Sequence, residues 1–167
     1  MLDHTLFPVT EVQAIGGPDG TVDLLDKTGY KFIVREDTGQ VLSCMTDEYK
    51  LVPNANIISA ATPILKQHKA VLKEAVVLGE GQRTVWKWIM PEVKIEVAPD
   101  DLMHPEIIIK NSYDGSLQVH VLSGAFRLVC ENGMIIGNTI SKHNYKHNKN
   151  NLNLNKLDEA IEQTIEK

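Results

Sequence analysis

Long apolar runs are missing from this chain of 167 residues. No purely apolar run exceeds five residues, whereas a helix that crosses a bilayer needs about 20. The first residues, MLDHTLFPVTEV, also lack a basic region followed by an apolar stretch, which is the pattern of a secretory signal. The sequence therefore predicts a cytoplasmic protein without a membrane-spanning segment.

Cysteine is scarce, and its positions do not suggest a metal site. Cys44 and Cys130 each lie in an apolar, strand-like run, and neither belongs to a CxxC or Cys/His pattern. This usage predicts two reduced thiols buried in the core, with no disulfide and no bound metal. The chain also lacks the GxxxxGK[ST] and GxGxxG loops, which excludes the commonest ATP and NAD sites. No cofactor is expected.

The net charge of −5 is unevenly distributed. Residues 132–157 contain four Lys, two His and no Asp or Glu, although the chain as a whole is acidic. A segment of this kind is the part of the chain most suited to a polyanion.

Short β-rich runs separated by turn dipeptides dominate the chain. Adjacent hairpins with segregated helices favour an α+β domain over a doubly wound nucleotide-binding fold. In the first half of the chain we expect two strands within residues 21–36 about a Thr28-Gly29 turn, and a tight hairpin over residues 40–52. In the second half we expect a pair of strands flanking residues 79–81 and a hairpin in which residues 106–110 pair with 117–130 across Asp114-Gly115. A last strand is expected at residues 134–140. Trp86 and Trp88 share one face of their strand, and this alternation favours a place in the core over an exposed stacking platform.

Two helices are expected. Residues 57–69 carry apolar positions at helical spacing, with Asn54 or Asn56 as the N-cap and Pro63 well inside. Residues 157–167 form an amphipathic terminal helix whose apolar side packs on the sheet or on a second subunit. The fold class is therefore α+β: a curved, mainly antiparallel sheet built from hairpins, with one central and one C-terminal helix. We expect one domain over residues 1–167, with an N-terminal arm at 1–20 and a basic, Asn-rich segment at 138–156.

A pair of polar motifs frames the predicted hairpin in the last third of the chain. Asn111-Ser112-Tyr113-Asp114-Gly115-Ser116 lies at its tip, and Phe126-Arg127-Leu128-Val129-Cys130-Glu131-Asn132-Gly133 follows at the end of its second strand. Together they resemble a signature of the phage- and plasmid-like protein family called domain of unknown function nine-three-two. The resemblance covers roughly residues 38–160. It implies an origin in a virus or mobile element, but it implies no reaction.

The motif residues have a structural and a functional interpretation. The structural one is that these residues build turns, since Asn, Asp, Ser and Gly are the usual turn formers; the functional one is that a polar loop held by rigid strands binds a ligand. The residues concerned are Asn111, Ser112, Asp114, Gly115, Ser116, Asn132 and Gly133. Arg127 is either a partly buried cation paired with a carboxylate such as Asp114 or Glu131, or an anion-binding group on the sheet.

The basic segment is the main candidate for binding. Its lysines suit phosphates, and Tyr145 suits stacking on a base; the alternative is a solvated linker to the terminal helix. His143 and His147 would share one face of a helix and could hold a metal there, but no third ligand is near and Asn-rich sequence forms helices poorly. The candidate nucleic-acid-binding residues are Arg127, Lys142, His143, Tyr145, Lys146, His147 and Lys149.

These patterns support three hypotheses about function. The first is an accessory protein of a phage or mobile element that binds single-stranded DNA or RNA without catalysis. The second is a protein that works by contacting a host protein or by assembly. The third is an enzyme for a small or nucleotide substrate that uses Asp114, Arg127 and a histidine, although no spacing typical of a nucleophile and its base is present.

Overall fold

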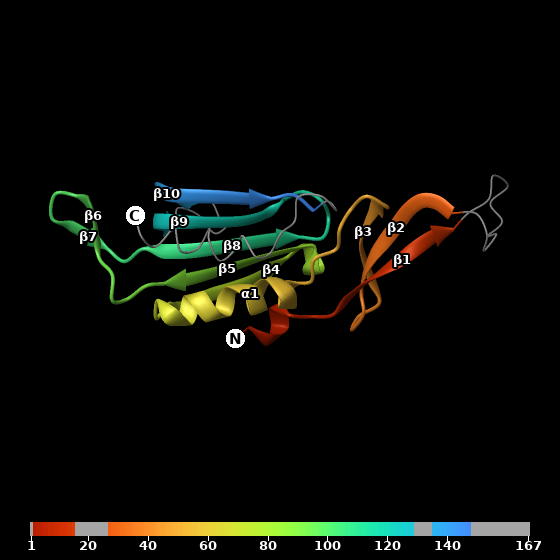
Figure 1. The fold of residues 1–167 in the computed structure, drawn as a ribbon, viewed down its shortest axis with the longest axis horizontal. Coiled ribbons are helices and arrows are strands. Elements are labelled where there is room, and N and C mark those ends of the chain that lie inside the picture. Colours follow the sequence, from red (N-terminus) through yellow and green to blue (C-terminus); the bar gives the residue numbers. More distant parts are fainter. Residues whose placement is uncertain (1, 16–26, 129–134, 148–167) are drawn as a thin grey trace.

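The computed structural model describes residues 2–15, 27–128 and 135–147. These ranges form three antiparallel sheets and one α-helix, so the fold is broadly α+β and consists mostly of strands (Figure 1). In chain order the elements are the 3-10 turn η1 (Asp3–Thr5), β1 (Val9–Ile15), β2 (Lys27–Arg35), β3 (Gln40–Thr46), α1 (Asn54–Gln67), β4 (Val71–Leu78), η2 (Gly79–Gly81), β5 (Arg83–Ile89), β6 (Ile95–Ala98), β7 (Asp101–Met103), β8 (Glu106–Ser112), β9 (Val119–Leu128) and β10 (Ile135–Tyr145).

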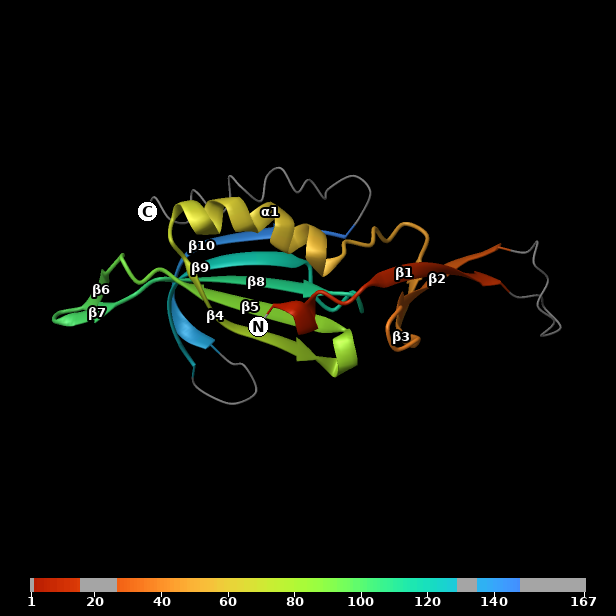
Figure 2. The same cartoon turned by 90° about the horizontal axis from the view of Figure 1, so that it is seen from below.

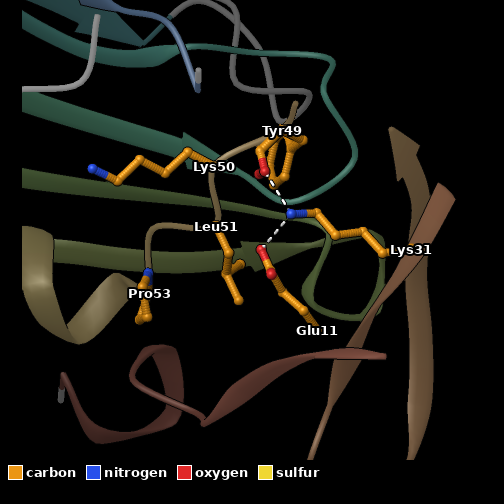
Figure 3. A pocket seen from close by; sticks show the side chains of 6 residues that line it. All are labelled: Glu11, Lys31, Tyr49, Lys50, Leu51 and Pro53. Carbon is orange, nitrogen blue, oxygen red and sulfur yellow. Dashed lines mark hydrogen bonds and ion pairs between the residues drawn. The ribbon is translucent and has the colours of Figure 1, made fainter. Parts of the chain in front are cut away.

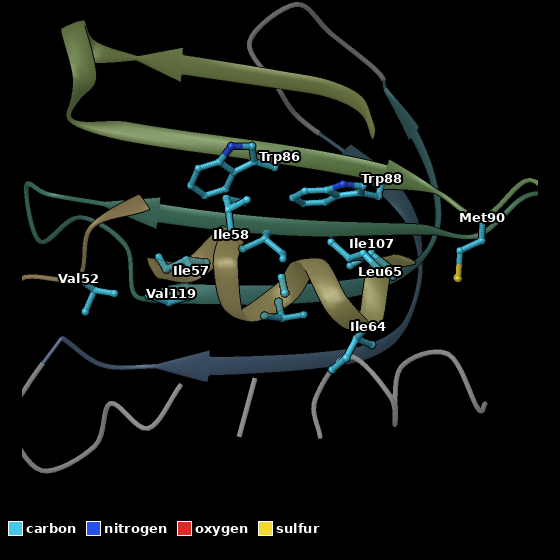
Figure 4. Packing of buried hydrophobic residues seen from close by; sticks show 13 residues of the cluster. Val52, Ile57, Ile58, Ile64, Leu65, Trp86, Trp88, Met90, Ile107 and Val119 are labelled. Atoms are coloured by element: carbon cyan, nitrogen blue, oxygen red, sulfur yellow. The ribbon is translucent and has the colours of Figure 1, made fainter. Parts of the chain in front are cut away.

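The main body is a five-stranded sheet in the order β10-β9-β8-β5-β4, with α1 lying on one of its faces (Figure 2). Side chains alternate across a strand, and along β5 the residues facing α1 are Thr84, Trp86 and Trp88, which are all buried. Both indoles lie between the sheet and the helix (Figure 4). The prediction that the two tryptophans belong to the core is therefore confirmed.

Helix α1 supplies the other half of this core. Its apolar positions Ile57, Ile58, Ala61, Ile64 and Leu65 are buried against the sheet. The helix begins at Asn54, three residues earlier than predicted, and continues through Pro63. Asn54 is not its N-cap. Pro53 holds that position, and the Asn54 side chain bonds to buried partners elsewhere.

A separate three-stranded sheet in the order β1-β2-β3 lies at one end of the molecule, and the β6–β7 hairpin extends from the other (Figures 1 and 2). A second core joins the three-stranded sheet to the main body. It consists of Phe7, Ile33, Leu42, Tyr49 and Tyr113.

Three predictions for the N-terminal part are wrong. Strand β2 runs through Thr28-Gly29, where a turn was expected, and Gly29 has φ +78 within it. Strand β3 pairs with β2 across the turn at residues 36–39, whereas residues 47–53 form no strand, so the hairpin over 40–52 does not exist. Part of the expected N-terminal arm, residues 9–15, is strand β1. The chain instead reverses at residues 36–39, where Gly39 has φ +72, and β2 pairs with both β1 and β3.

The later hairpins are confirmed. Strands β4 and β5 flank Gly79–Gly81, and β8 and β9 pair across a connection in which Gly115 has φ +73. Strand β10 extends to Tyr145, further than predicted, so it includes the first part of the basic segment. The expected terminal helix over 157–167 lies outside the described residues.

Two other predictions concern thiols and membranes. Cys44 is exposed, so the prediction that it is buried is wrong; β3 turns its side chain to the solvent face of the three-stranded sheet. Cys130 lies outside the described residues. In the described ranges, α1 and the short turns are not long and apolar enough to cross a bilayer.

Candidate nucleic-acid interface

The face of the five-stranded sheet opposite α1 carries basic side chains, two lysines and a histidine, from three neighbouring strands. Lys110 on β8 lies directly opposite His120 on β9. Lys142 on β10 lies opposite Leu122, two residues further along β9. Because paired residues of an antiparallel sheet point to the same side, all three side chains project from the face opposite α1, where Lys142 is exposed and Lys110 and His120 are half-buried. Lys110, His120 and Lys142 are called the basic face below.

The positive charge of Lys142 lies close enough to disfavour protonation of both Lys110 and His120. Burial lowers the pKa of Lys110, and the charges of Lys87 and Lys142 lower it further. Burial also lowers the pKa of His120, with Lys142 and Lys110 adding to the effect. Within the described residues none of the three forms an ion pair, whereas the neighbouring Lys87 is neutralised by Glu74 at 2.6 Å. A bound anion would relieve this repulsion.

The predicted binding residues in the basic segment do not share one surface. Lys142 and Lys146 are exposed, as a phosphate contact requires. Tyr145 is half-buried and packs against the main core, so its ring is not a free stacking platform. The His147 ring stacks on Tyr49 with centroids 5.1 Å apart. Its Nδ1 lies 3.2 Å from the Lys50 carbonyl oxygen.

Five predicted site residues are only partly described or not described at all. The Arg127 backbone pairs with Ile136, and that of His143 pairs with Val121. Their side chains, and the whole of Lys149, Asn132 and Gly133, lie outside the described residues. The pair His143 and His147 is not on a helix, since residue 143 belongs to strand β10. No group of three metal-ligating side chains occurs within the described ranges.

The Asn111–Ser116 motif builds structure. Ser112 Oγ accepts a bond from the Leu117 N–H at 3.0 Å and donates one to its carbonyl at 2.9 Å. The Asp114 carboxylate accepts a bond from the Ser116 N–H at 2.9 Å. It also faces Arg83 at 3.8 Å, so the ionic partner of Asp114 in the described residues is Arg83, which the sequence analysis did not single out.

A buried polar network connects this motif to the start of α1. The Asn54 amide donates to the Thr5 carbonyl at 2.7 Å and to Thr84 Oγ1 at 3.0 Å. It accepts a bond from Asn111 Nδ2 at 2.8 Å. The Tyr113 hydroxyl accepts the Asn54 backbone N–H at 2.8 Å. Buried polar groups must find partners, and here they fix the helix, the N-terminal turn and the sheet to one another.

A pocket of about 450 Å³ lies where the three-stranded sheet meets the connection to α1 (Figure 3). It is lined by Glu11, Lys31, Tyr49, Lys50, Leu51 and Pro53. The Lys31 ammonium is nearly buried, and it is held by Glu11 at 2.9 Å and by the Tyr49 carbonyl at 2.7 Å. Because a buried cation needs partners of this kind, we interpret Lys31 as a tie between the sheet and the chain before α1, not as a ligand-binding group.

The lowered pKa values of His147 and His120 predict that the free energy of unfolding depends on pH. Burial lowers the pKa of His147, although the hydrogen bond with Lys50 opposes this, and the pKa of His120 is lowered as described above. An unfolded histidine titrates near a pKa of about 6.5. As the pH falls below this value the unfolded chain binds protons first, so the stability that is complete above about pH 6.5 decreases. We expect a lower free energy of unfolding at about pH 5 than at about pH 7.5.

Replacing one histidine at a time identifies which of them causes the pH dependence of stability. His147→Gln should reduce the difference in stability between the two pH values, as measured by urea denaturation. His4→Gln, at an exposed site, is the control for losing any histidine. An unchanged pH dependence in both His147→Gln and His120→Gln would contradict the assignment.

Comparisons with known proteins agree with the resemblance noted in the sequence. Two Escherichia coli K12 proteins, the UPF0380 proteins YfjQ and YafZ, are each 42% identical to this chain over 43 residues. The match covers 26% of this chain and only 16% of each relative. No solved structure matches. The model of the family "Domain of unknown function (DUF932)" matches residues 41–166, which is most of the chain, and the protein therefore belongs to that family.

Proposed function

We propose that this protein binds single-stranded nucleic acid without catalysis, as an accessory protein of a phage or other mobile element. The observation that carries the proposal is the basic face, where Lys110, His120 and Lys142 come together without an acidic partner in the described residues. Lysine ammonium groups without a carboxylate partner neutralise phosphates, and a neutral histidine can donate a hydrogen bond to a phosphate oxygen. The phage or mobile-element role rests on the resemblance of the two polar motifs.

The arrangement of the basic face favours contact with the backbone of the nucleic acid. Neighbouring strands are about 4.8 Å apart, so the basic side chains of β8, β9 and β10 span roughly 10 Å and can follow a chain of phosphates. Exposed Lys146 lies just beyond β10 and extends this surface. Single strands are commonly bound on sheet surfaces of this kind. Trp86 and Trp88 are buried and Tyr145 packs on the core, so we expect little base stacking and little sequence preference.

The test is a pair of matched double variants. Lys110→Ala with Lys142→Ala should weaken binding of a labelled oligothymidine and lower the slope of log K against log salt by about 1.4, since each lost contact removes about 0.7 on single strands. Fluorescence anisotropy at several salt concentrations between about 50 and 200 mM measures both quantities. Melting temperatures should change little for the exposed Lys142.

The control removes two positive charges elsewhere. Lys66 and Lys69 are exposed on and after α1, away from the basic face. Lys66→Ala with Lys69→Ala should therefore bind like the wild type. An equal loss of nucleic-acid affinity in the two double variants would show that binding depends on the net charge of the protein and not on the basic face. A wild-type protein that does not bind at about 50 mM salt would overturn the proposal.

The enzyme hypothesis has less support. It requires Asp114 to act on a substrate, but that carboxylate is engaged by Ser116 and faces Arg83. Neither arrangement leaves it positioned as a general base. We therefore do not assign a reaction to this site.

A further inference from the structure

His147 joins the chain just after β10 to the connection that leads into α1. The Lys50 N–H donates to the His147 carbonyl oxygen at 3.1 Å, and the His147 ring nitrogen Nδ1 lies 3.2 Å from the Lys50 carbonyl oxygen. The ring also stacks on Tyr49, with an angle of 14° between the two planes. Lys50 and His147 are 97 positions apart in the chain, so these contacts tie two distant segments together. They are called the His147 clasp below.

The geometry of the clasp determines which ring nitrogen carries the hydrogen. A carbonyl oxygen can only accept a hydrogen bond, so Nδ1 donates to Lys50. In the neutral ring Nε2 is then an acceptor that carries no hydrogen. Nε2 is buried and forms no hydrogen bond within the described residues, although His147 as a whole is half-buried. The clasp therefore fits the neutral form of the ring.

Protonation would place a second N–H, and a positive charge, at the buried Nε2 atom. A buried N–H without an acceptor is costly, and a buried charge without a partner is more so. When the ring is released into water, it is solvated and titrates near its usual pKa of about 6.5. A lower pH therefore favours the open clasp. Burial lowers the pKa of His147, in agreement with this, although the bond to Lys50 opposes the shift.

The charged groups of the neighbouring segments do not offer a partner to the protonated ring. They are the cations Lys146, Lys50 and Lys31 and the acids Glu11, Asp47, Glu48 and Asp114. The ammonium groups cannot accept a hydrogen bond. The Tyr49 hydroxyl donates to the Ser112 carbonyl oxygen at 3.1 Å, so this titratable group is also engaged elsewhere.

The four carboxylates have other surroundings. Glu11 is paired with Lys31, and Asp114 faces Arg83. Asp47 accepts a bond from Gln13, and Glu48 is exposed. In the part of the chain that the structure describes, no carboxylate forms an ion pair with His147, so none holds the charged ring in the clasp.

We propose that the His147 clasp is a pH-dependent switch, closed when the ring is neutral and open when it is protonated. Its contacts lie after the last residue of β10 and before the first residue of α1, so the clasp can open without breaking a sheet or the helix. Lys146 directly precedes His147 and extends the basic face, so opening acts at the edge of the proposed nucleic-acid interface. This consequence rests on the proposed function, whereas the switch itself does not.

The sign of the pH effect follows from the lowered pKa. Above about pH 6.5 neither form of the clasp is protonated, and the closed form is at its most stable. Below this pH the open form binds a proton first. The open population then grows by up to about tenfold per pH unit, until the closed form takes up the proton as well.

Hydrogen exchange at two neighbouring backbone amides tests the switch. The Lys50 N–H donates to His147, whereas the Tyr49 N–H donates to the Thr46 carbonyl oxygen at 3.0 Å in the turn after β3. Exchange is measured by NMR without nucleic acid and corrected for the intrinsic effect of pH. Protection of the Lys50 amide should be constant between about pH 7.5 and 6.5 and should fall at least about fivefold by about pH 5. The Tyr49 amide should keep its protection.

Two histidine variants make the assignment specific. His147→Gln does not titrate, so the protection of the Lys50 amide should be equal at the two ends of the pH range. His120→Gln, which removes the other histidine with a lowered pKa, should respond like the wild type. A failure of the wild type to bind nucleic acid would leave these exchange results unchanged.

Several outcomes would overturn the switch. One is a Lys50 amide that is unprotected at about pH 7.5, or that keeps its protection down to about pH 5. Another is an equal fall at the Tyr49 amide, which would show a wider opening of the fold. A response that persists in His147→Gln, or that is lost in His120→Gln, would assign the pH effect to another group.

Discussion

Replacement of Asn54 by alanine is expected to lower the free energy of unfolding by about 3 to 4 kcal/mol. Its side chain makes three buried hydrogen bonds, to the Thr5 carbonyl, Thr84 Oγ1 and Asn111 Nδ2. Alanine leaves these partners buried and with fewer bonds, and each such group costs about 1 to 3 kcal/mol. The loss affects η1, α1, β5 and β8 at once, because the network ties all four elements together.

Asn56 provides a matched control for this variant. It is the same residue type in the first turn of the same helix, but its side chain is exposed. Asn56→Ala should change stability by no more than about 0.5 kcal/mol. Urea denaturation with unchanged m-values measures both. If Asn54→Ala cost less than about 1 kcal/mol, the network would not have the role assigned to it.

Replacement of Trp86 by alanine should cost about 3 to 5 kcal/mol, the range for removing a large aromatic side chain from a core. The Trp86 side chain is fully buried under α1 (Figure 4). Its indole N–H also donates to Thr5 Oγ1 at 2.9 Å. The variant therefore loses both apolar burial and a polar contact with the N-terminal turn.

Phenylalanine at the same position separates the two contributions. Trp86→Phe keeps most of the apolar burial but loses the bond to Thr5, and we expect a cost of about 1 to 2 kcal/mol. Trp88→Phe, at a neighbouring buried position on the same face of β5, reports the loss of ring volume alone. Equal costs for the two phenylalanine variants would show that the bond to Thr5 contributes nothing measurable.

Local turn chemistry predicted the hairpins of the main sheet but not those of the three-stranded sheet. Glycines at positions 79, 81 and 115 adopt positive φ in real turns. Gly29 also has positive φ, yet it lies inside β2. A Gly dipeptide marks where the backbone can adopt an unusual conformation. Whether the chain reverses there depends on how the flanking residues pair with the neighbouring strands, here β1 and β3.

Only part of the candidate site was predicted, because the sequence does not reveal which strands pair. Lys142 was found because it belongs to a stretch rich in Lys and Asn. Lys110 and His120 were missed because each is a single polar residue in an apolar strand, and only the register of β8 with β9 brings them together. The alternation of apolar and polar residues along IIIKNS and LQVHV shows that Lys110 and His120 each point away from the core. It does not show that they meet.

The position of β3 has a consequence for how this protein is divided into parts. The family match begins at residue 41, within β3, whereas β1 and β2 precede it. Thr5, Phe7 and Ile33, which also lie before the match, complete the buried network and the second core. The part of the chain that matches the family model is therefore smaller than the part needed to complete the buried polar network and the second core. An excision at residue 41 would separate β3 from β2 and leave Tyr113 and Leu42 facing water.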